Sequence, residues 1–484
     1  MAQAVPVSHE RVARESVLLN AGGAVAFAAI VALLVGFFRP QLDGAGLVAA
    51  GLAIALVPAG FFLVAFIRAD RIEPEPRGMI LGVFVLGAIL AYGIGQPAIR
   101  SFFKVQEWSG GSLWLELAGA ILIAGVVQQF LIYAAVRYSV YHSSEFDERV
   151  DGIIYGAAAG LGYATAFNIL YVTGNNGVDL AIGALRVVTE ALAFACLGGV
   201  TGYFIARAKF DKMGPTWLPI GLLIAAVLNG VIDVLLGAAP GLGGGFSFNP
   251  WLGLVAAVLI AALIFFLLFR LIERLHRVTE MGVAAPETSA IDKMLIGRGT
   301  KDEPEWIVWI IAAVLLIAGA LIGRDVLGQT RTATAAGMSV TYPARWSRTS
   351  EAGASIAAFD RKGGGADGAR VSASQVPKAD VLVAGGGTIL DGATNWTLSR
   401  GAELAGYRVL NMAAVTVAGR EAARVDYAYL LDASSGAMPS LMRATDTLVP
   451  CGDKVCVLSF AAPAAEYSGL SETAGNLLAG WIVP

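Results

Sequence analysis

The stretch Leu113–Val136, LWLELAGAILIAGVVQQFLIYAAV, decides the class of this protein. A helix needs about 20 predominantly apolar residues to cross the hydrocarbon core of a bilayer. This stretch is long enough to do so. Its strongly polar side chains are Glu116 near one end, and Gln128 and Gln129 deep inside. The stretch therefore predicts a transmembrane helix that carries polar groups within the membrane.

The composition of the whole chain agrees with a membrane protein. Of its 484 residues, 56% are hydrophobic and 15% are charged, whereas soluble domains are about 25% charged. The mean hydropathy is +0.68. The formal net charge is −3, so no basic excess indicates a nucleic-acid partner.

Working outward from Leu113–Val136, nine segments are long and apolar enough to span a membrane. The first follows a polar N-terminus and is interpreted as a signal-anchor helix that stays in the protein. The nine segments are 17–38, 46–67, 78–97, 113–136, 152–173, 180–205, 216–237, 251–272 and 305–323.

Lysine and arginine predict the orientation, because they concentrate in cytoplasmic loops. With nine spans, five basic segments fall on one side, and only the loop with Arg100 and Lys104 dissents. We therefore expect a cytoplasmic N-terminus and an extracytoplasmic C-terminal domain in the cell membrane. The basic residues of that side are Arg11 and Arg14; Arg68, Arg71 and Arg77; Arg137 and Arg149; Arg207, Lys209 and Lys212; and Arg274, Arg277, Lys293, Arg298 and Lys301.

The C-terminal part, 330–484, has a different pattern. Apolar and polar residues alternate in 424–430, which is typical of a strand. Further strands are predicted at 338–342, 354–360, 406–416 and 454–461, and helices at 385–403 and 466–480. The fold class is therefore an α-helical polytopic membrane domain followed by an α+β domain with an antiparallel sheet. The predicted parts are a cytoplasmic N-terminus (1–16), an eight-helix membrane domain (17–272), a cytoplasmic linker (273–304), a ninth transmembrane helix (305–323) and the extracytoplasmic domain (330–484).

Cys451 and Cys456 bracket a turn-forming stretch at the mouth of a predicted hairpin. Residues paired across a hairpin can reach bridging distance, and disulfides persist outside the cytoplasm. We expect a disulfide here, with two free thiols as the alternative. Cys196 lies in an apolar run and is interpreted as a small buried side chain.

Polar side chains inside a membrane are expensive and indicate function or helix pairing. Arg186 and Glu190 lie four residues apart, so they can neutralise each other on one helix face. Asn229 and Asp233 share the same spacing and can bond neighbouring helices. Either set can instead line a polar cavity. The cavity and binding candidates are Gln128, Gln129, Tyr155, Asn168, Arg186, Glu190, Asn229 and Asp233.

Two motifs resemble the PrsW family of intramembrane proteases. The stretch 68–76, RADRIEPEP, is similar to the family's D-R-x-E-P-E-P sequence. The stretch 151–171, DGIIYGAAAGLGYATAFNILY, resembles its D-G-x-x-Y-G…G-L-G-F-A-x-x-E-N-x-x-Y segment. Their order and spacing match over about 68–235, so the resemblance implies the family's helical membrane fold.

The positions at which the family carries its proposed acids, bases and metal ligands are substituted here. The resemblance places Gln128 and Gln129 at a Glu-Glu pair, and Ile132 at the lysine that follows it. The remaining substituted positions are Phe167 at a glutamate, Phe194 at a histidine and Asn229 at a second histidine.

These substitutions predict no catalytic site, no metal and no cofactor. Glutamine does not ionise, so it cannot act as a general base, and zinc sites are built from Cys, His, Asp and Glu. The chain has three histidines, and His9, His142 and His276 all flank the membrane ends.

The opening of the outer domain, Met338–Ser347, resembles that of PsbP-like domains, and so does Val417–Ala422 before a strand. Such domains usually bind a partner, and this one contains no histidine. The sequence thus predicts a pseudoprotease that holds a transmembrane or extracytoplasmic protein partner without cutting it. Two alternatives remain: an active intramembrane protease that uses Glu190 and Asp233, and an ion-coupled transporter.

Overall fold

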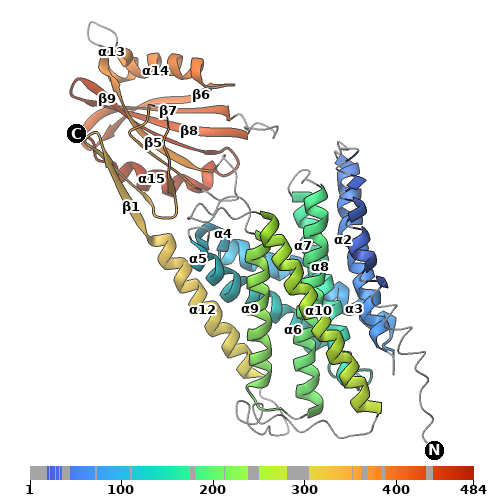
Figure 1. Ribbon diagram of the computed structural model, residues 1–484. Coiled ribbons are helices and arrows are strands. Elements are labelled where there is room, and N and C mark those ends of the chain that lie inside the picture. Colours follow the sequence, from blue (N-terminus) through green and yellow to red (C-terminus); the bar gives the residue numbers. More distant parts are fainter. Residues whose placement is uncertain are drawn as a thin grey trace, which may run out of the picture. The chain divides into compact units, whose positions relative to one another are not determined.

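The computed structural model describes residues 44–70, 74–109, 112–174, 180–211, 213–237, 250–280, 305–351, 353–360, 368–382, 387–431 and 440–484, and parts of 19–37. The chain divides into two compact units (Figure 1). The membrane unit contains Met1–Val105 and Ser112–Gly323. The C-terminal unit contains Gln106–Gly111 and Arg324–Pro484.

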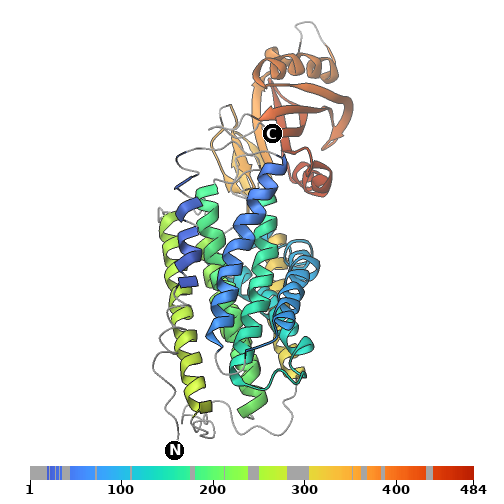
Figure 2. The same cartoon turned by 90° about the vertical axis from the view of Figure 1, so that its right-hand side faces the viewer.

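The membrane unit is helical, and its helices run alongside one another as a bundle (Figures 1 and 2). The first part contains α2 (Gly44–Ala69), α3 (Arg77–Leu90), the π-helical turns η1 (Ala91–Gly95) and η2 (Ala98–Phe102), α4 (Val105–Trp108), α5 (Leu113–Ala118), the π-helix η4 (Gly119–Gly125) and α6 (Val126–Ser139). Then follow α7 (Arg149–Gly174), α8 (Leu180–Asp211), α9 (Trp217–Gly237), α10 (Pro250–Glu280) and α12 (Trp306–Gly328).

Among the described residues, 8 helices are long and apolar enough to cross a membrane. Each overlaps one of the last eight predicted segments, so the multi-pass class is confirmed. The first predicted segment, 17–38, lies largely outside the described residues. The helix of the predicted span 78–97 continues through two π-helical turns to Phe102, and the short helix α4 follows after Lys104, whose φ is 48°.

The closest helix contact of the bundle joins α7 to α8 through glycines. A Cβ atom on Gly156 would lie 2.1 Å from the carbonyl oxygen of Gly198, and one on Gly202 would lie 1.7 Å from that of Gly152. Glycines four residues apart fall on one helix face. Only residues without a side chain allow two backbones in a membrane to approach this closely.

A second side of α7 packs closely on α3. A Cβ on Gly87 would lie 2.2 Å from the carbonyl oxygen of Ala159, and one on Gly162 would lie 1.8 Å from that of Phe84. Helix α7 therefore contacts the backbones of both α3 and α8. These two contacts fix the positions of its polar side chains.

The π-helix η4 lies directly before the stretch that carries Gln128 and Gln129. A π-helical turn bonds residue i to i+5 and so changes the rotation of the residues that follow it. Here η4 packs on α9, where a Cβ on Gly125 would lie 2.4 Å from the carbonyl oxygen of Ala226. This contact fixes the start of α6 against α9.

The C-terminal unit is built on antiparallel strands, which confirms the predicted fold class. A seven-stranded sheet has the order β3-β4-β5-β9-β8-β7-β6, and β1 and β2 form a separate two-stranded sheet. The strands are β1 (Thr330–Ala335), β2 (Met338–Pro343), β3 (Ser347–Arg348), β4 (Ile356–Phe359), β5 (Arg370–Pro377), β6 (Arg408–Val417), β7 (Arg420–Leu431), β8 (Ser440–Cys451) and β9 (Lys454–Pro463). The helices are α13 (Lys378–Val381), α14 (Ile389–Glu403), the 3₁₀ turn η6 (Tyr467–Leu470) and α15 (Ser471–Ala479).

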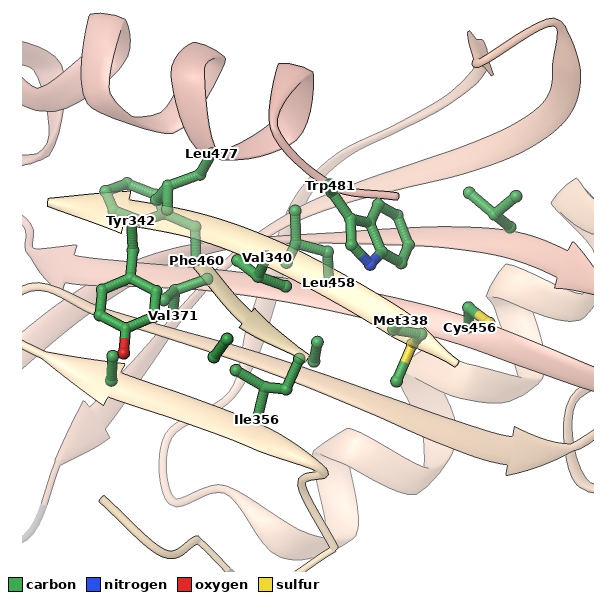
Figure 3. Close-up of a cluster of buried hydrophobic side chains, with 14 of the residues drawn as sticks. Met338, Val340, Tyr342, Ile356, Val371, Cys456, Leu458, Phe460, Leu477 and Trp481 are labelled. Carbon is green, nitrogen blue, oxygen red and sulfur yellow. The ribbon is translucent and has the colours of Figure 1, made fainter. Parts of the chain in front are cut away.

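Helices cover the two faces of the seven-stranded sheet, with α14 on one face and α15 on the other (Figure 1). The core under α15 also receives the β1–β2 hairpin. Figure 3 shows Val340 and Tyr342 of β2 beside Phe460 of β9 and Trp481. The core under α14 contains Val425, Tyr427 and Leu448. Strand β7 therefore contributes side chains to both cores: Ala422 lies in the core under α15, and Val425 and Tyr427 lie in the core under α14.

A buried carboxylate fixes α14 to the sheet. Asp446 of β8 has no exposed surface. It accepts hydrogen bonds from the Trp396 indole at 2.7 Å and from the Tyr427 hydroxyl at 3.0 Å. The Arg400 guanidinium lies 3.4 Å away and supplies the opposite charge. A buried charge must be paired and hydrogen-bonded to be tolerated, so these three side chains lock the helix position.

The β8–β9 hairpin is closed by a disulfide between Cys451 and Cys456, whose Cα atoms lie 5.9 Å apart. The two cysteines are diagonal neighbours, because Cys451 faces Lys454 and Cys456 faces Val449. The β1–β2 and β6–β7 hairpins turn at Ala336–Gly337 and Ala418–Gly419, where both residues have positive φ. This conformation matches the twist of two-residue hairpins.

Exchange of one glycine at the α7–α8 contact tests its importance. We expect Gly156→Ala to lower the free energy of unfolding by about 1–3 kcal/mol, because the new methyl group forces two backbones apart. The measurement is SDS-induced unfolding of the protein in detergent micelles. Gly82→Ala is the matched control, since a Cβ there meets nothing within 4 Å. Equal unfolding curves for the two variants would contradict the close contact.

Candidate functional site

The polar core of the membrane unit is built from side-chain amides. Asn229 of α9 donates a hydrogen bond from Nδ2 to Oε1 of Gln128 on α6. The next residue, Gln129, accepts a hydrogen bond of 3.1 Å from the Thr201 hydroxyl of α8. All four side chains are buried. Adjacent helical residues point about 100° apart, so the two glutamines join α6 to two different helices.

An aromatic pair joins α7 to α8. Phe194 of α8 stacks on Tyr163 of α7 with ring centroids 5.4 Å apart. The Tyr163 hydroxyl approaches Gly95 of η1, where a Cβ would lie 2.1 Å from it. Phe167 lies one turn further along α7 and is half-buried. The two predicted phenylalanine positions therefore contribute packing surface and no polar group.

A charged group lies further along α8 and α9. Arg186 is within electrostatic range of both Glu190 and Asp233, which come from α8 and α9. Glu116 of α5 is in turn within range of Asp233. The structure thus places Asp233 beside the predicted Arg186–Glu190 pair, and one guanidinium is shared by two carboxylates.

Asn168 binds the backbone instead of the amide core. Its Nδ2 donates a hydrogen bond of 3.3 Å to the carbonyl oxygen of Val187 on α8. The buried polar atoms that have no hydrogen-bond partner among the described residues include Nε2 of Gln129, the Tyr163 hydroxyl and Oδ1 of Asn168. These atoms retain hydrogen-bonding capacity inside the bundle.

The structure separates Tyr155 from the other predicted site residues. Its hydroxyl donates to Oε2 of Glu75, which lies in the segment between α2 and α3. The Glu75 carboxyl is also within hydrogen-bonding reach of Asp151 at the start of α7. Asp151 accepts hydrogen bonds from the backbone amides of Asp147 at 2.9 Å and Glu148 at 2.5 Å. We call Glu75, Asp151 and Tyr155 the carboxyl cluster.

The carboxyl cluster brings together the two motifs singled out in the sequence. Glu75 belongs to the E-P-E-P stretch, and Asp151 and Tyr155 belong to D-G-I-I-Y-G. Sequence reasoning included Tyr155 but missed the two carboxyls as its partners. The signal was present, because acidic residues in two separate motifs of one membrane domain must find partners when buried.

The membrane unit is similar in sequence to known proteins. The family model described as "PrsW family intramembrane metalloprotease" matches residues 75–271. "Protease PrsW" of Bacillus subtilis is 31% identical over 194 residues, which are 40% of this chain and 83% of that protein. "Protease PrsW" of Geobacillus kaustophilus is 33% identical over 191 residues, which are 39% of this chain and 79% of that protein.

This chain belongs to the PrsW family. Its membership rests on the membrane unit, because the matched residues, 75–271, lie before the C-terminal unit.

The C-terminal unit has more distant likenesses among solved structures. A cyanobacterial PsbP from Synechocystis is 14% identical, with a TM-score of 0.26 over 32% of this chain and 92% of that chain. LpqN of Mycobacterium tuberculosis, described as involved in cell envelope biogenesis, is 16% identical, with a TM-score of 0.23 over 32% of this chain and 91% of that chain. TM-scores this low establish neither a shared fold nor a shared role, so the PsbP-like resemblance of the C-terminal unit stays a prediction.

The description of the PrsW family implies a metal, and the donor set of this member does not fit one. In the part of the chain that the structure describes, no three His, Cys, Asp or Glu side chains gather as metal ligands. Gln128 and Asn229 are neutral amides bonded to each other. Neutral amides bring no charge to a divalent metal, and zinc is held by Cys, His, Asp and Glu.

The carboxyl cluster makes stability depend on pH. Burial raises the pKa of the Glu75 carboxyl, although the hydrogen bond from Tyr155 opposes the change. A carboxyl whose folded-state pKa is raised stabilises the fold at low pH, and this contribution disappears as pH rises through the folded-state value. We expect Glu75→Gln, which keeps hydrogen-bonding capacity without a titrating proton, to flatten the alkaline side of the melting-temperature profile.

The measurement is thermal unfolding in detergent micelles between pH 5 and 9. Glu145→Gln is the matched control, because this exposed carboxyl neighbours the cluster. A Glu75→Gln profile that keeps the wild-type slope would show that Glu75 does not titrate in this range.

Proposed function

We propose that this PrsW-family protein is catalytically inactive and holds a membrane or envelope protein partner without cleaving it. The observation that carries the proposal is the amide core. Gln128 and Asn229 occupy positions at which the family resemblance places a glutamate and a histidine, and they hydrogen-bond to each other.

An amide core cannot perform the chemistry of peptide hydrolysis. Hydrolysis needs a group that takes a proton from water or a metal that lowers the pKa of water. Glutamine and asparagine have no titrating proton in the physiological range. The ionisable groups Glu190 and Asp233 lie elsewhere in the bundle, within electrostatic range of Arg186.

The same amides suit the binding of a transmembrane segment. Polar side chains that bond across helices in lipid stabilise association by about 0.6–2 kcal/mol each. Nε2 of Gln129, the Tyr163 hydroxyl and Oδ1 of Asn168 have no partner among the described residues. A partner helix with Ser, Thr, Asn or Gln side chains supplies the complementary groups.

The C-terminal domain would then meet the extracytoplasmic part of that partner. This assignment follows from the basic loops, which favour a cytoplasmic N-terminus in the cell membrane. The domain limits stay those proposed from the sequence, with the membrane domain at 17–272, the ninth helix at 305–323 and the outer domain at 330–484.

Comparison of membrane proteomes tests inactivity directly. We expect cells with wild-type protein and cells with Gln128→Ala/Gln129→Ala to contain the same fragments of membrane proteins. The measurement is mass spectrometry of new protein termini in both strains. A fragment that requires the wild-type glutamines would sink the proposal.

The metal content of the purified protein provides an independent test. We expect detergent-purified protein to hold far less than one zinc per chain after exhaustive dialysis, because the donor set lacks ionising ligands. Restoration of the ligands in Gln128→Glu/Gln129→Glu/Phe194→His/Asn229→His is the positive comparison. About one tightly held zinc in the wild-type protein would contradict the ligand argument and revive a protease.

The second candidate function is an active protease that uses Glu190 and Asp233, which the structure brings near each other. The same carboxylates with Arg186 could serve an ion-coupled transporter. Asp233→Asn tests both alternatives, because it removes one of the two acids. Loss of a cleavage product in this variant would support the protease, and loss of pH-dependent flux in proteoliposomes would support the transporter.

A further inference from the structure

One sheet face in the C-terminal unit is only partly covered. The core under α15 draws on β7 and β8 at Ala422, Val449 and Cys451, near one end of these strands. Beyond these residues, Arg424, Leu430, Leu441 and Arg443 are exposed on the same face, whereas Asp426 and Thr447 are buried. We call this region, formed by β6, β7 and β8, the open face.

The open face carries two arginines in one cross-strand row. Arg408 of β6 pairs with Ala428 of β7, which in turn pairs with Arg443 of β8. Residues directly opposite each other in a sheet point to the same side. Two strand spacings separate the arginines by about 10 Å, and the small Ala428 side chain leaves the space between them open.

Both arginines are exposed, and neither forms an ion pair among the described residues. Arg443 lies over the Tyr467 ring, 4.8 Å from its centroid. The acidic residue nearest in the sheet is Asp426, which is buried. It already accepts hydrogen bonds from Arg424 at 3.0 Å and from the Thr445 hydroxyl at 2.5 Å. The row therefore presents two exposed positive charges.

Two leucines adjoin this row. Leu430 of β7 pairs with Leu441 of β8 and lies two residues beyond Ala428, so it points to the same face. The two side chains are 39% and 53% exposed. An apolar pair beside two positive charges is typical of a surface that binds an amphipathic acidic segment, because apolar contact gives affinity and charge gives selectivity.

The open face also ends at an unpaired strand edge. Among the described strands, β6 pairs with β7 alone. Residues 409–417 contain neither charge nor proline, the devices by which proteins usually protect an edge. An extended segment could pair with this edge only beside β6 and in the plane of the sheet, so the edge is a feature separate from the open face.

We propose that the open face binds an acidic, partly apolar segment of a partner protein. Carboxylates of that segment pair with Arg408 and Arg443, and an apolar side chain packs on Leu430 and Leu441. The inference rests on the proposed binding function and names the chemistry of the partner. It does not depend on whether the membrane unit cleaves, so the test below is separate from the cleavage test.

The experiment uses the full chain in nanodiscs of neutral lipid and a fluorescein-labelled peptide of repeating Glu-Glu-Leu-Leu. We expect saturable binding that weakens as salt is raised, because exposed charge pairs are screened. Arg408→Ala/Arg443→Ala should weaken binding about tenfold, since each exposed pair contributes modestly. The measurement is fluorescence anisotropy.

Two controls make the result specific. Arg331→Ala/Arg348→Ala removes two exposed arginines from β1 and β3 and should bind as the wild type does. A Lys-Lys-Leu-Leu peptide should not bind. Equal binding by both double variants, or of both peptides, would overturn the proposal.

Other occupants give different outcomes. Vesicles of phosphatidylglycerol that bind the wild type in place of the peptide would assign the face to a lipid surface. A concentration-dependent dimer that disappears in Arg408→Ala/Arg443→Ala would assign it to a second copy of the chain. Either result without peptide binding overturns the assignment to an acidic partner segment.

Discussion

The glycine contact between α7 and α8 is the constraint on which the membrane unit depends. Apolar side chains gain little from leaving lipid for a protein interior, so helix association in a membrane relies on close packing and polar bonds. The carbonyl of Gly198 occupies the place where a side chain of Gly156 would be. This approach sets how far the side chains of α8 reach, and so it decides that Thr201 meets Gln129.

The polar groups of the bundle follow from that packing. Neutral amides occupy the level of Gln128 and Gln129, where Gln128 bonds to Asn229 and Gln129 accepts from the Thr201 hydroxyl. Charged groups occupy other levels. Along α8, the eleven positions from Thr201 to Glu190 correspond to about 16 Å at 1.5 Å per residue. The amides and the charged groups are thus separated along the bundle, with Glu190 about three turns of α8 away from Thr201.

Much of this architecture could be predicted from the sequence, because hydropathy and small residues act locally. Helical and strand periodicity predicts the spans from 46–67 onward and the antiparallel sheet. It also predicts that the adjacent side chains of Gln128 and Gln129 point in different directions. Strands β5 and β8 were not predicted. Residues 370–377 and 440–451 carry polar or charged side chains, and the folded sheet buries some of them or pairs them with other segments. Asp446 of β8, for example, pairs with Arg400 of α14. Such pairs form only when segments distant in sequence meet.

The carboxyl cluster shows the same limit at the site. Glu75 and Tyr155 are eighty residues apart in sequence, and no local pattern indicates that they touch. Their meeting requires α3 to pack on α7, and that packing requires Gly87 and Gly162 to admit the backbone carbonyls of Ala159 and Phe84. These two glycines thus do more than allow close packing, because they bring the acidic residues of the two motifs together. In this chain the two motifs therefore meet in a tertiary contact, the carboxyl cluster, which neither motif predicts alone.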